Sequence, residues 1–511
     1  MVSLPSFQSQ IRKTVTGLTY HHENGEANET TSLLRGNGHS VLNGSAHQNG
    51  HGGGAWVYWE FFFNTRYTPG TENPKPWVKY PAHTWHITKA TLLSSPVNIL
   101  LVAVPIGIVA GQAGWDPVAV FVINFFAIIP LAAVLSYATE EISVNLGEAL
   151  GGLLNATFGN AVELIVSIIA LRDRQIEVVK SSMIGSILSN LLLVMGMCFF
   201  FGGIVNMRDE EGRGQEQSFQ TITAQTTASL MTLSAASMIL PGTLFMIING
   251  TGGEDKEARN QVVLSLSRGT AIILLLLYVL YLWFQLRTHH ELFSAEAGVT
   301  PEPTQNGIQP PAEAATEDIF PVLAQGHEEE EEEEEEEWHM SPWSAGAVLV
   351  VTTVLVSICA DYLVESIDAL VERAHLSRSF IGLILIPIVG NAAEHVTAVV
   401  VAVKNKMDLA MGVAIGSSLQ IALFVTPFLV VLGWIMDRDM DLHFETFETV
   451  SFGLAVLVVI YTVQDGKSNY LEGAMLMALY VIIALAFFVT PSQYFDADWV
   501  VGKLGSLVSS T

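Results

Sequence analysis

The sequence has little cysteine, little charge and little basic character for a chain of 511 residues. It contains two cysteines, Cys198 and Cys359, which is too few for a framework of disulfides. Only 14% of its residues are charged, against about 25% in an ordinary soluble domain, so lipid must cover much of its surface. Lys and Arg number 23 against 50 Asp and Glu, and no basic stripe is present, which excludes a nucleic-acid reader. Because HExxH and GxSxG motifs are absent, we do not expect an enzyme.

Long apolar runs take the place of the missing charge, and half of all residues are hydrophobic. Two runs, 146–171 and 379–403, each surround a central glutamate, and the others hold no Lys, Arg, Asp or Glu. About 20 helical residues cross the hydrocarbon core of a bilayer, where backbone groups cannot stay unpaired. The sequence therefore predicts an all-α polytopic membrane protein with eleven transmembrane helices, in contact with lipid. The charge-free runs are Thr91–Trp115, Pro117–Thr139, Ser181–Met207, Ser218–Gly253, Gly269–Leu286, Trp343–Ala360, Leu409–Met436, Thr449–Gln464 and Gly473–Phe495.

Three polar segments lie outside these runs. Residues 1–90 are rich in Gly, Asn, Ser and His, and they predict a mostly disordered N-terminal tail. Residues 288–341 include the glutamate run Glu328–Glu337, and we expect an acidic loop or helix there. Its composition fits either a Ca²⁺-sensing segment or a simply solvated one. Residues 496–511 form a C-terminal tail.

An internal repeat is the strongest signal in the sequence. GNAVELIVSIIAL begins at Gly159 and GNAAEHVTAVVVAV begins at Gly390, an offset of 390 − 159 = 231 residues. At the same offset, without a gap, IGSIL at 184–188 matches IGSSL at 415–419. The match therefore extends over two consecutive helices and the loop between them, which indicates a duplication.

The order of the predicted helices gives the geometry of this duplication. The two glutamates fall on the third and the eighth predicted helix, and because five is odd these helices cross the membrane in opposite directions. We therefore predict two inverted five-helix repeats, 116–287 and 342–495, preceded by one extra helix at 91–115. Transporters built in this way bind their ion near the midplane, where interrupted helices of the two halves meet.

The repeated motifs predict a cation site made of oxygen atoms. A carboxylate inside a membrane helix is costly, so it faces the interior of the bundle and has a function. An asparagine three residues before each glutamate shares a helix face with it, and the next helix of each repeat adds hydroxyl and amide oxygens. Such ligands suit Ca²⁺, with Mn²⁺ as an alternative, and no cofactor is expected. The candidate ligands are Glu163, Glu394, Asn160, Asn391, Ser186, Ser189, Ser417 and Gln420.

Two carboxylates carry two negative charges, which either one Ca²⁺ or two protons neutralise. Binding of metal and binding of protons then exclude each other, which predicts an antiporter that exchanges Ca²⁺ for H⁺ by alternating access. Downhill proton flow would drive Ca²⁺ into an acidic compartment. His395 directly follows Glu394 and could help to move protons, although a packed, hydrogen-bonded histidine explains it as well.

The two motifs resemble the signature repeats of the cation/proton exchanger family of the Ca²⁺/cation antiporter superfamily, above all those of fungal vacuolar Ca²⁺/H⁺ exchangers. The resemblance covers about residues 90–495. It implies eleven helices with a central acidic segment, a vacuolar membrane as the location, and exchange through Glu163 and Glu394. It also implies the same roles for the matching residues Asn391, Ser417 and Gln420, and for Asn160, Ser186 and Ser189 in the first repeat. The long N-terminal tail departs from this pattern.

Acidic residues near predicted helix ends are ambiguous. Glu140, Asp361 and Glu365 could line entrances that concentrate cations, or they could simply be solvated. Lysines before the first helix and after the eighth fall on one side, which predicts a cytosolic N-terminus and a luminal C-terminus. The sequence leaves open a Na⁺-coupled Ca²⁺ exchanger and a cation channel, and it does not give the oligomeric state.

Overall fold

The computed structural model describes the greater part of the apolar region of the chain. The last part of the predicted N-terminal tail is described and is helical at 76–90, where we expected mostly disorder. Residues 1–61, 63–67 and 72 of that tail, the Glu328–Glu337 run with Glu328 and Glu337 themselves, and the C-terminal tail lie outside the described residues. What we predicted for those segments stays a prediction. The described residues are 68–71, 73–146, 154–155, 157–209, 211–250, 256–289 and 340–489, together with Phe62 and Gly151.

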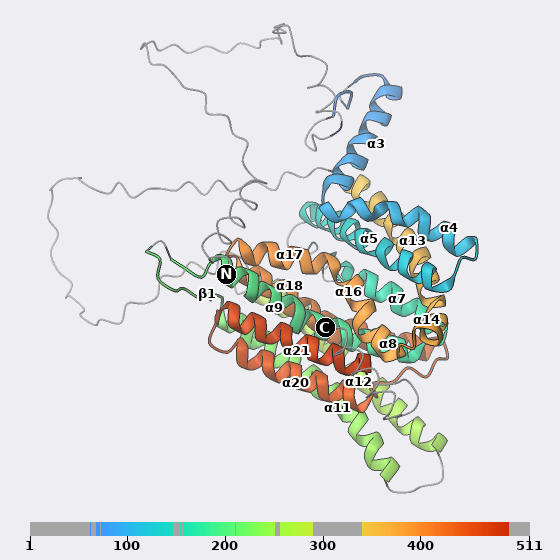
Figure 1. Ribbon diagram of the computed structural model, residues 1–511, viewed down its shortest axis with the longest axis vertical. Coiled ribbons are helices and arrows are strands. Elements are labelled where there is room, and N and C mark those ends of the chain that lie inside the picture. The colour runs from blue at the N-terminus through green and yellow to red at the C-terminus, as the bar shows by residue number, and fades with distance from the viewer. Residues whose placement is uncertain are drawn as a thin grey trace, which may run out of the picture.

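Helices make up almost all of the described structure (Figure 1). The first half contains α3 (Pro76–Leu93), η1 (Pro96–Val102), α4 (Ala103–Gln112), α5 (Pro117–Leu146), α7 (Ala161–Arg172), α8 (Ile176–Leu188), η2 (Ser189–Val194), α9 (Met195–Met197), η3 (Cys198–Gly202), α10 (Gly203–Val205), β1 (Gln217–Ser218), α11 (Thr221–Gly250), α12 (Lys256–Trp283) and η4 (Phe284–Thr288). The second half contains α13 (Pro342–Glu365), α14 (Ile367–Ala374), α15 (Arg378–Phe380), η7 (Ile381–Leu385), α16 (Ile386–Gly390), α17 (Ala392–Val403), α18 (Met407–Gln420), η8 (Ile421–Val425), α19 (Thr426–Ile435), α20 (Thr446–Thr462), β2 (Lys467–Ser468) and α21 (Tyr470–Val489).

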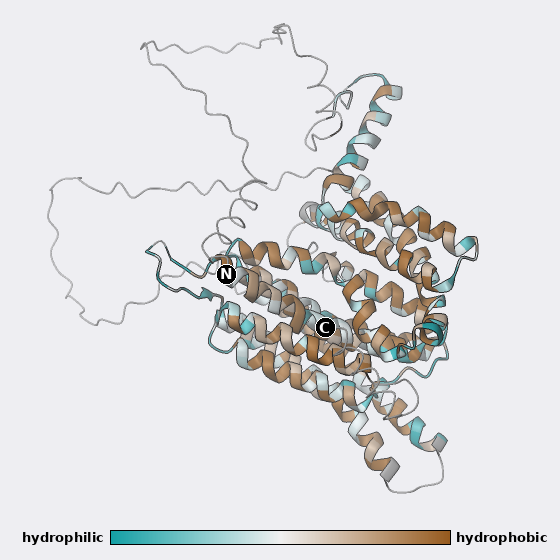
Figure 2. Ribbon diagram, viewed as in Figure 1, coloured by the Kyte–Doolittle hydropathy of each residue, from teal (hydrophilic) through white to brown (hydrophobic). Residues whose placement is uncertain are grey.

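The helices are apolar enough for a membrane protein. Within the described ranges, seven are long and apolar enough to cross a bilayer, and two bent pairs of helices pass the same test together. The helix α20 is apolar but shorter. Figure 2 shows hydrophobic residues along these helices and hydrophilic residues at their ends. The prediction of a helical multi-pass membrane protein is thus confirmed, and β1 with β2 forms a short antiparallel ribbon between loops.

The first predicted span differs from the prediction. Helix α3 begins well before position 91 and ends at Leu93, and the chain then bends by 111° before η1 and α4 continue. The break has a local cause, because Pro96 lacks an N–H group and disfavours helical backbone at Ser95. Ser95 is accordingly extended, and its side chain caps the new helix by accepting a hydrogen bond from the backbone N–H of Val97.

Helices α5 and α13 lie antiparallel and pack along their lengths (Figure 1). At one end Arg373 pairs with Asp116, which precedes α5. At the other end the backbone N–H of Met340 donates to Glu141 over 3.1 Å. These ends define two faces of the bundle. We call the face near Met340 and Glu141 the Glu140 side and the opposite face the Arg172 side.

The duplication is visible in the backbone. Helices α7 and α17 each end in a tight turn, in which Arg174 (φ 62°) and Asn405 (φ 63°) are left-handed. These two positions are 405 − 174 = 231 residues apart, which is the offset of the sequence repeat. Arg174 lies on the Arg172 side. The turn of Asn405 lies on the Glu140 side, because Val400 and Val401 near the end of α17 line a cavity together with Glu140. The two motif helices therefore run in opposite directions.

Close backbone packing positions the helix that carries the serines. A Cβ atom on Gly185 of α8 would lie 2.6 Å from the carbonyl carbon of Leu383, and one on Gly382 would lie 2.8 Å from the Cβ of Ser181. Only glycine therefore allows α8 and η7 to touch. This contact joins the two repeats next to Ser186.

Candidate cation site

Both glutamates occupy the first turn of an interrupted helix. Helix α7 begins after Asn160 (φ −102°, ψ 27°), and α17 begins after Asn391 (φ −85°, ψ 8°). The backbone leaves helical geometry at both asparagines, and α17 is bent by 57° from the preceding helices. The N-terminus of a helix carries partial positive charge, which favours carboxylates at Glu163 and Glu394.

Glu163 lies against the backbone of the other repeat. Its side chain is 4% exposed. A Cβ atom added to Gly390 would lie 2.9 Å from the carboxyl carbon of Glu163 and closer still to Oε1. Gly390 lies only four residues before Glu394, so this contact brings the two glutamates close together. The absence of a side chain at Gly390 thus gives the Glu163 carboxylate its place at the centre of the bundle.

A chain of hydrogen bonds connects the two repeats at the same level. The amide of Asn190 donates to Glu394 Oε2 over 3.0 Å and to Ser417 Oγ over 2.9 Å. Ser417 Oγ in turn donates to Asn160 Oδ1 over 2.8 Å, and Asn160 Nδ2 donates to Gln420 Oε1 over 2.7 Å. The network brings together one carboxylate, three amides and one hydroxyl from both repeats.

Four buried oxygens at this level have no hydrogen-bond partner among the described residues. They belong to four different side chains: Glu163 Oε2, Ser186 Oγ, Asn190 Oδ1 and Asn391 Oδ1. The amide of Asn391 is oriented by its bond to the carbonyl of Ser186, 3.3 Å away. Buried polar groups are nearly always paired in folded proteins, so an unpaired group of oxygens calls for a ligand. Oxygen donors of this kind fit a hard cation such as Ca²⁺ or Mn²⁺.

A cavity of about 400 Å³ reaches the centre from the Glu140 side. Glu394, Ser417 and Gln420 line its inner part, and the exposed Glu140 lines it towards the Glu140 side. Glycines from both repeats, among them Gly390, complete its wall. A cation could therefore enter from the Glu140 side.

Polar bridges connect the helices on the opposite face. Arg172 pairs with Asp361 of α13, and Arg378 donates to Asp368 of α14 over 2.9 Å. Gln175 also donates to Asp368, over 3.2 Å. These bridges join the α13–α14 segment to α7, to α15 and to the turn after α7.

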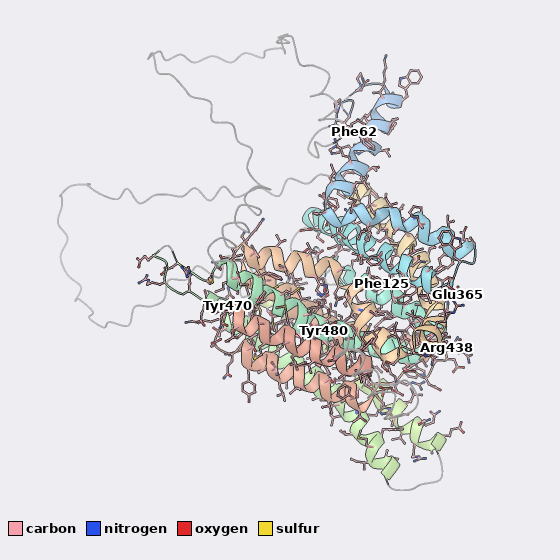
Figure 3. The ribbon with its side chains drawn as sticks, in the orientation of Figure 1. Phe62, Phe125, Glu365, Arg438, Tyr470 and Tyr480 are labelled. Carbon is pink, nitrogen blue, oxygen red and sulfur yellow. The ribbon has the colours of Figure 1, made fainter. Side chains whose placement is uncertain are left out.

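The acidic residues predicted near entrances therefore have different surroundings. Glu140 lies at the cavity, whereas Asp361 and Glu365 lie on the Arg172 side and are not among the residues that line this cavity. Glu365 is exposed at the same end of the bundle as Arg438 (Figure 3). The role of Asp361 and Glu365 at an entrance stays a prediction.

The remaining predicted residues lie beside the site. The ring Nε2 of His395 is 3.2 Å from Ser189 Oγ, so this serine faces the histidine. Among the described residues, no three His, Cys, Asp or Glu side chains gather at one point. The centre therefore consists of two carboxylates with amides and hydroxyls, without a nitrogen or sulfur cluster for a transition metal.

Sequence reasoning missed Asn190, although it contacts both Glu394 and Ser417. The signal was available, because Asn190 directly follows Ser189 and lies four residues after Ser186. Comparison of the repeats did not select it, since the residue 231 positions later is the apolar Ile421. Asn190 therefore breaks the symmetry of the site.

Comparisons with known proteins agree with this architecture. The model of the family described as sodium/calcium exchanger protein matches residues 117–287 and 344–489. A vacuolar calcium ion transporter of Schizosaccharomyces pombe is 45% identical, over 79% of this chain and 87% of that protein. A Ca²⁺/H⁺ antiporter of Aphanothece halophytica is 43% identical, over 77% and 96%. The solved structure of the Ca²⁺/H⁺ antiporter protein YfkE is 33% identical, with a TM-score of 0.58 over 77% of this chain and 99% of that chain.

Proposed function

Since the chain belongs to the sodium/calcium exchanger protein family, we propose that it is a secondary active antiporter that exchanges Ca²⁺ for H⁺. Mn²⁺, a similarly hard cation, is its second candidate cargo. The observation that carries the proposal is the group of unpaired buried oxygens around Glu163, next to Glu394. The names of the two relatives, a calcium ion transporter and a Ca²⁺/H⁺ antiporter, support the same cargo and the same coupling ion.

Charge neutrality at the centre provides the exchange mechanism. Glu163 and Glu394 together carry two negative charges when deprotonated, and one Ca²⁺ or two protons cancel them. The unpaired oxygens of Ser186, Asn190 and Asn391 replace part of the hydration shell of the metal. Protons bind to the carboxylates alone, so the oxygens of Ser186, Asn190 and Asn391 coordinate no ion when the site is protonated. Each carboxylate therefore binds either the metal or a proton, and no cofactor takes part.

Alternating access requires the cavity to open on each face in turn. In the conformation described above, the cavity leads to the Glu140 side, and the bridges of Arg172, Gln175 and Arg378 join the helices on the other face. We propose that the α5–α13 layer shifts against the helices that carry the two glutamates. This movement would separate Arg172 from Asp361 and close the cavity near Glu140.

We propose eleven transmembrane helices, as the sequence predicts: one extra helix followed by two inverted repeats of five. The opposite directions of α7 and α17 support this arrangement, as do the left-handed turns spaced by the repeat offset. The N-terminus and the acidic segment 288–341 would lie on the Glu140 side. In the membrane of an acidic vacuole, that side faces the cytosol and the C-terminus faces the lumen. Neutral cytosol then deprotonates the site and loads it with Ca²⁺.

The test is ⁴⁵Ca²⁺ uptake into proteoliposomes with an acidic interior, for the wild type and for Glu394→Gln. Wild-type uptake should need the proton gradient and should be independent of Na⁺. Glu394→Gln should abolish it, because an amide neither binds a transported proton nor neutralises the metal. Glu365→Gln is the matched control, since Glu365 is exposed on the Arg172 side and should leave uptake unchanged.

Three outcomes would contradict the proposal. Uptake that needs Na⁺ in place of the proton gradient would make the chain a Na⁺-coupled Ca²⁺ exchanger. Current that persists without any gradient of protons would make it a cation channel. Normal uptake by Glu394→Gln would remove the carboxylate pair from the mechanism.

A further inference from the structure

Helix α3 lies across the direction of the membrane-crossing helices. Its axis makes an angle of 111° with the segment Pro96–Gln112, which packs against α5. Figure 1 shows α3 standing away from the bundle near the ends of α5 and α13. If α4 and α5 cross the bilayer, α3 must therefore run close to the membrane plane, at the level of the headgroups on the Glu140 side.

The outer half of α3 is exposed to an unusual degree. Residues 74–81 are all exposed, and Trp77 and Tyr80 are 79% and 69% exposed. None of the described residues covers them. Trp and Tyr prefer the interface between hydrocarbon and water, because their rings are apolar at one end and polar at the other. An aromatic pair held at headgroup height suits a lipid surface.

The charge of this segment is opposite to that of the chain as a whole. The net charge of the protein is −27, yet no Asp or Glu occurs between Asn73 and Trp115. Lys75 and Lys79 are exposed on either side of Trp77, while Lys89 is buried and donates to Thr68 over 2.9 Å. Two exposed ammonium groups, each two residues from Trp77 in the sequence, complement the phosphate and carboxylate groups of anionic lipids.

The hinge of α3 borders the cation entrance. A second cavity, of about 280 Å³, is lined by residues 94–97 at the break after α3. The same cavity is lined by Glu140, Ala393 and Thr397, all of which also line the central cavity. The position of α3 and the shape of the entrance therefore share one wall.

We infer that α3 is a binding surface for anionic lipid headgroups on the Glu140 side, and that its binding to lipid sets the width of the cation entrance through the hinge at 94–97. The occupant is a lipid, because the helix lies along the membrane plane and presents lysines next to interfacial aromatic rings. The binding part does not depend on the exchange reaction, whereas the effect on the entrance rests on the proposed function.

A fluorescence experiment tests the binding part. The full-length variant Tyr80→Cys is labelled at the new cysteine with an environment-sensitive dye. Both native cysteines are buried, so the dye reacts at position 80. Vesicles contain phosphatidylcholine alone or phosphatidylcholine with phosphatidylserine. A dye at Trp343→Cys is the matched control, because position 343 is 90% exposed at the start of α13 on the same side and has no lysine within ten residues.

We expect phosphatidylserine to shift the dye at position 80 to a drier environment and to leave the dye at position 343 unchanged. Neutralising both lysines by Lys75→Gln and Lys79→Gln should weaken headgroup binding by about 30-fold, since each lysine near an anionic surface contributes about fivefold. The ratio of ⁴⁵Ca²⁺ uptake rates in the two lipid mixtures should then fall to one.

The lipid proposal is wrong if the dye at position 80 responds equally in both mixtures, or if the lysine variants behave like the wild type. It is also wrong if the dye is already shielded in detergent and becomes exposed on deletion of 328–337, since the acidic segment would then be the occupant. A lipid-dependent dye signal with lipid-independent uptake overturns the effect on the entrance. A wild type without proton-driven uptake leaves the dye result standing and instead contradicts the proposed antiport.

Discussion

Replacing Gly390 with alanine should displace the Glu163 carboxylate and weaken Ca²⁺ binding. The new methyl carbon would lie 2.9 Å from Cδ of Glu163. Carbon atoms in contact stay about 3.5 Å apart, so the carboxyl group must move by about 0.6 Å or more. Calcium ligands lie within a narrow range of about 2.3–2.6 Å, and a shift of about 1 Å at a reacting group can cost about 100-fold.

We therefore expect Gly390→Ala to lower the apparent Ca²⁺ affinity by about 10-fold to 100-fold. Crowding in a packed core also costs about 1–3 kcal/mol of stability, so the variant should unfold at a lower temperature but still be recovered. The assay is the Ca²⁺ dependence of proton-driven ⁴⁵Ca²⁺ uptake, with the thermal shift on adding Ca²⁺ as a second measure of binding.

Gly412→Ala is the matched control for this experiment. Gly412 also lines the central cavity, but a Cβ atom there meets no other atom within 4 Å. Its affinity should stay within about twofold of the wild type, because no ligand moves. Wild-type affinity in Gly390→Ala would refute the role of Glu163 as a ligand. An equal loss in both variants would show that the cavity tolerates no added volume, whatever the position.

Three more predictions concern the ligands, the protons and the closed face. Asn190→Leu should lower the apparent Ca²⁺ affinity by about tenfold or more, since it removes a buried oxygen and a charge-assisted hydrogen bond worth about 1.5–3 kcal/mol. The Ca²⁺ dependence of uptake measures this affinity. Lowering the pH by one unit should weaken the apparent Ca²⁺ affinity by about tenfold for each proton that Ca²⁺ must displace. The loss is about 100-fold when both Glu163 and Glu394 are protonated. Ca²⁺ titrations at several pH values give the slope of the logarithm of the affinity against pH. Arg172→Gln should change the rate of Ca²⁺/Ca²⁺ exchange by at most about fivefold, because an exposed ion pair contributes about 0.2–1 kcal/mol.

Each of these predictions has a distinct contrary result. Unchanged affinity in Asn190→Leu would mean that the asymmetric amide is only structural. A slope of one proton per Ca²⁺ would mean that only one carboxylate titrates during exchange. If the charge exchange Arg172→Asp with Asp361→Arg fails to restore the wild-type rate, the ion pair does not act as a pair across the closed face.

The sequence predicts the helical membrane fold and the central pair of glutamates for a simple physical reason. Charge is rare in lipid, so the repeated carboxylates of Glu163 and Glu394 stand out against apolar runs. Asn190 carries no charge and lies inside one of those runs, and its repeat counterpart Ile421 is apolar. Neither charge nor symmetry could therefore select it, and only the packing of η2 against α17 and α18 reveals its contacts.

The structure adds to or differs from the sequence-based predictions at two further places, Asp361 and the break after Leu93. From its place near a predicted helix end, Asp361 is a candidate for a residue that lines a cation entrance. In the folded protein it pairs with Arg172, which lies 189 residues earlier in the sequence. The break after Leu93 did have a local signal in Ser95 and Pro96, yet the continuous lack of charge from Thr91 onward favoured one straight helix. Charge-free length predicts that a segment is buried in lipid, but it does not predict that the segment is straight.

The two central carboxylates, Glu163 and Glu394, have a consequence for the leakage of ions. An empty binding site that moved from one face of the membrane to the other would let the ion gradients run down. An antiporter must therefore make this movement of the empty site slow. With neither metal nor protons bound, closing the cavity would enclose two bare negative charges in a medium of low polarity, and isolated buried charges are prohibitively costly. The same carboxylates that attract the cation therefore prevent the empty protein from turning over, and tight coupling requires no additional gate.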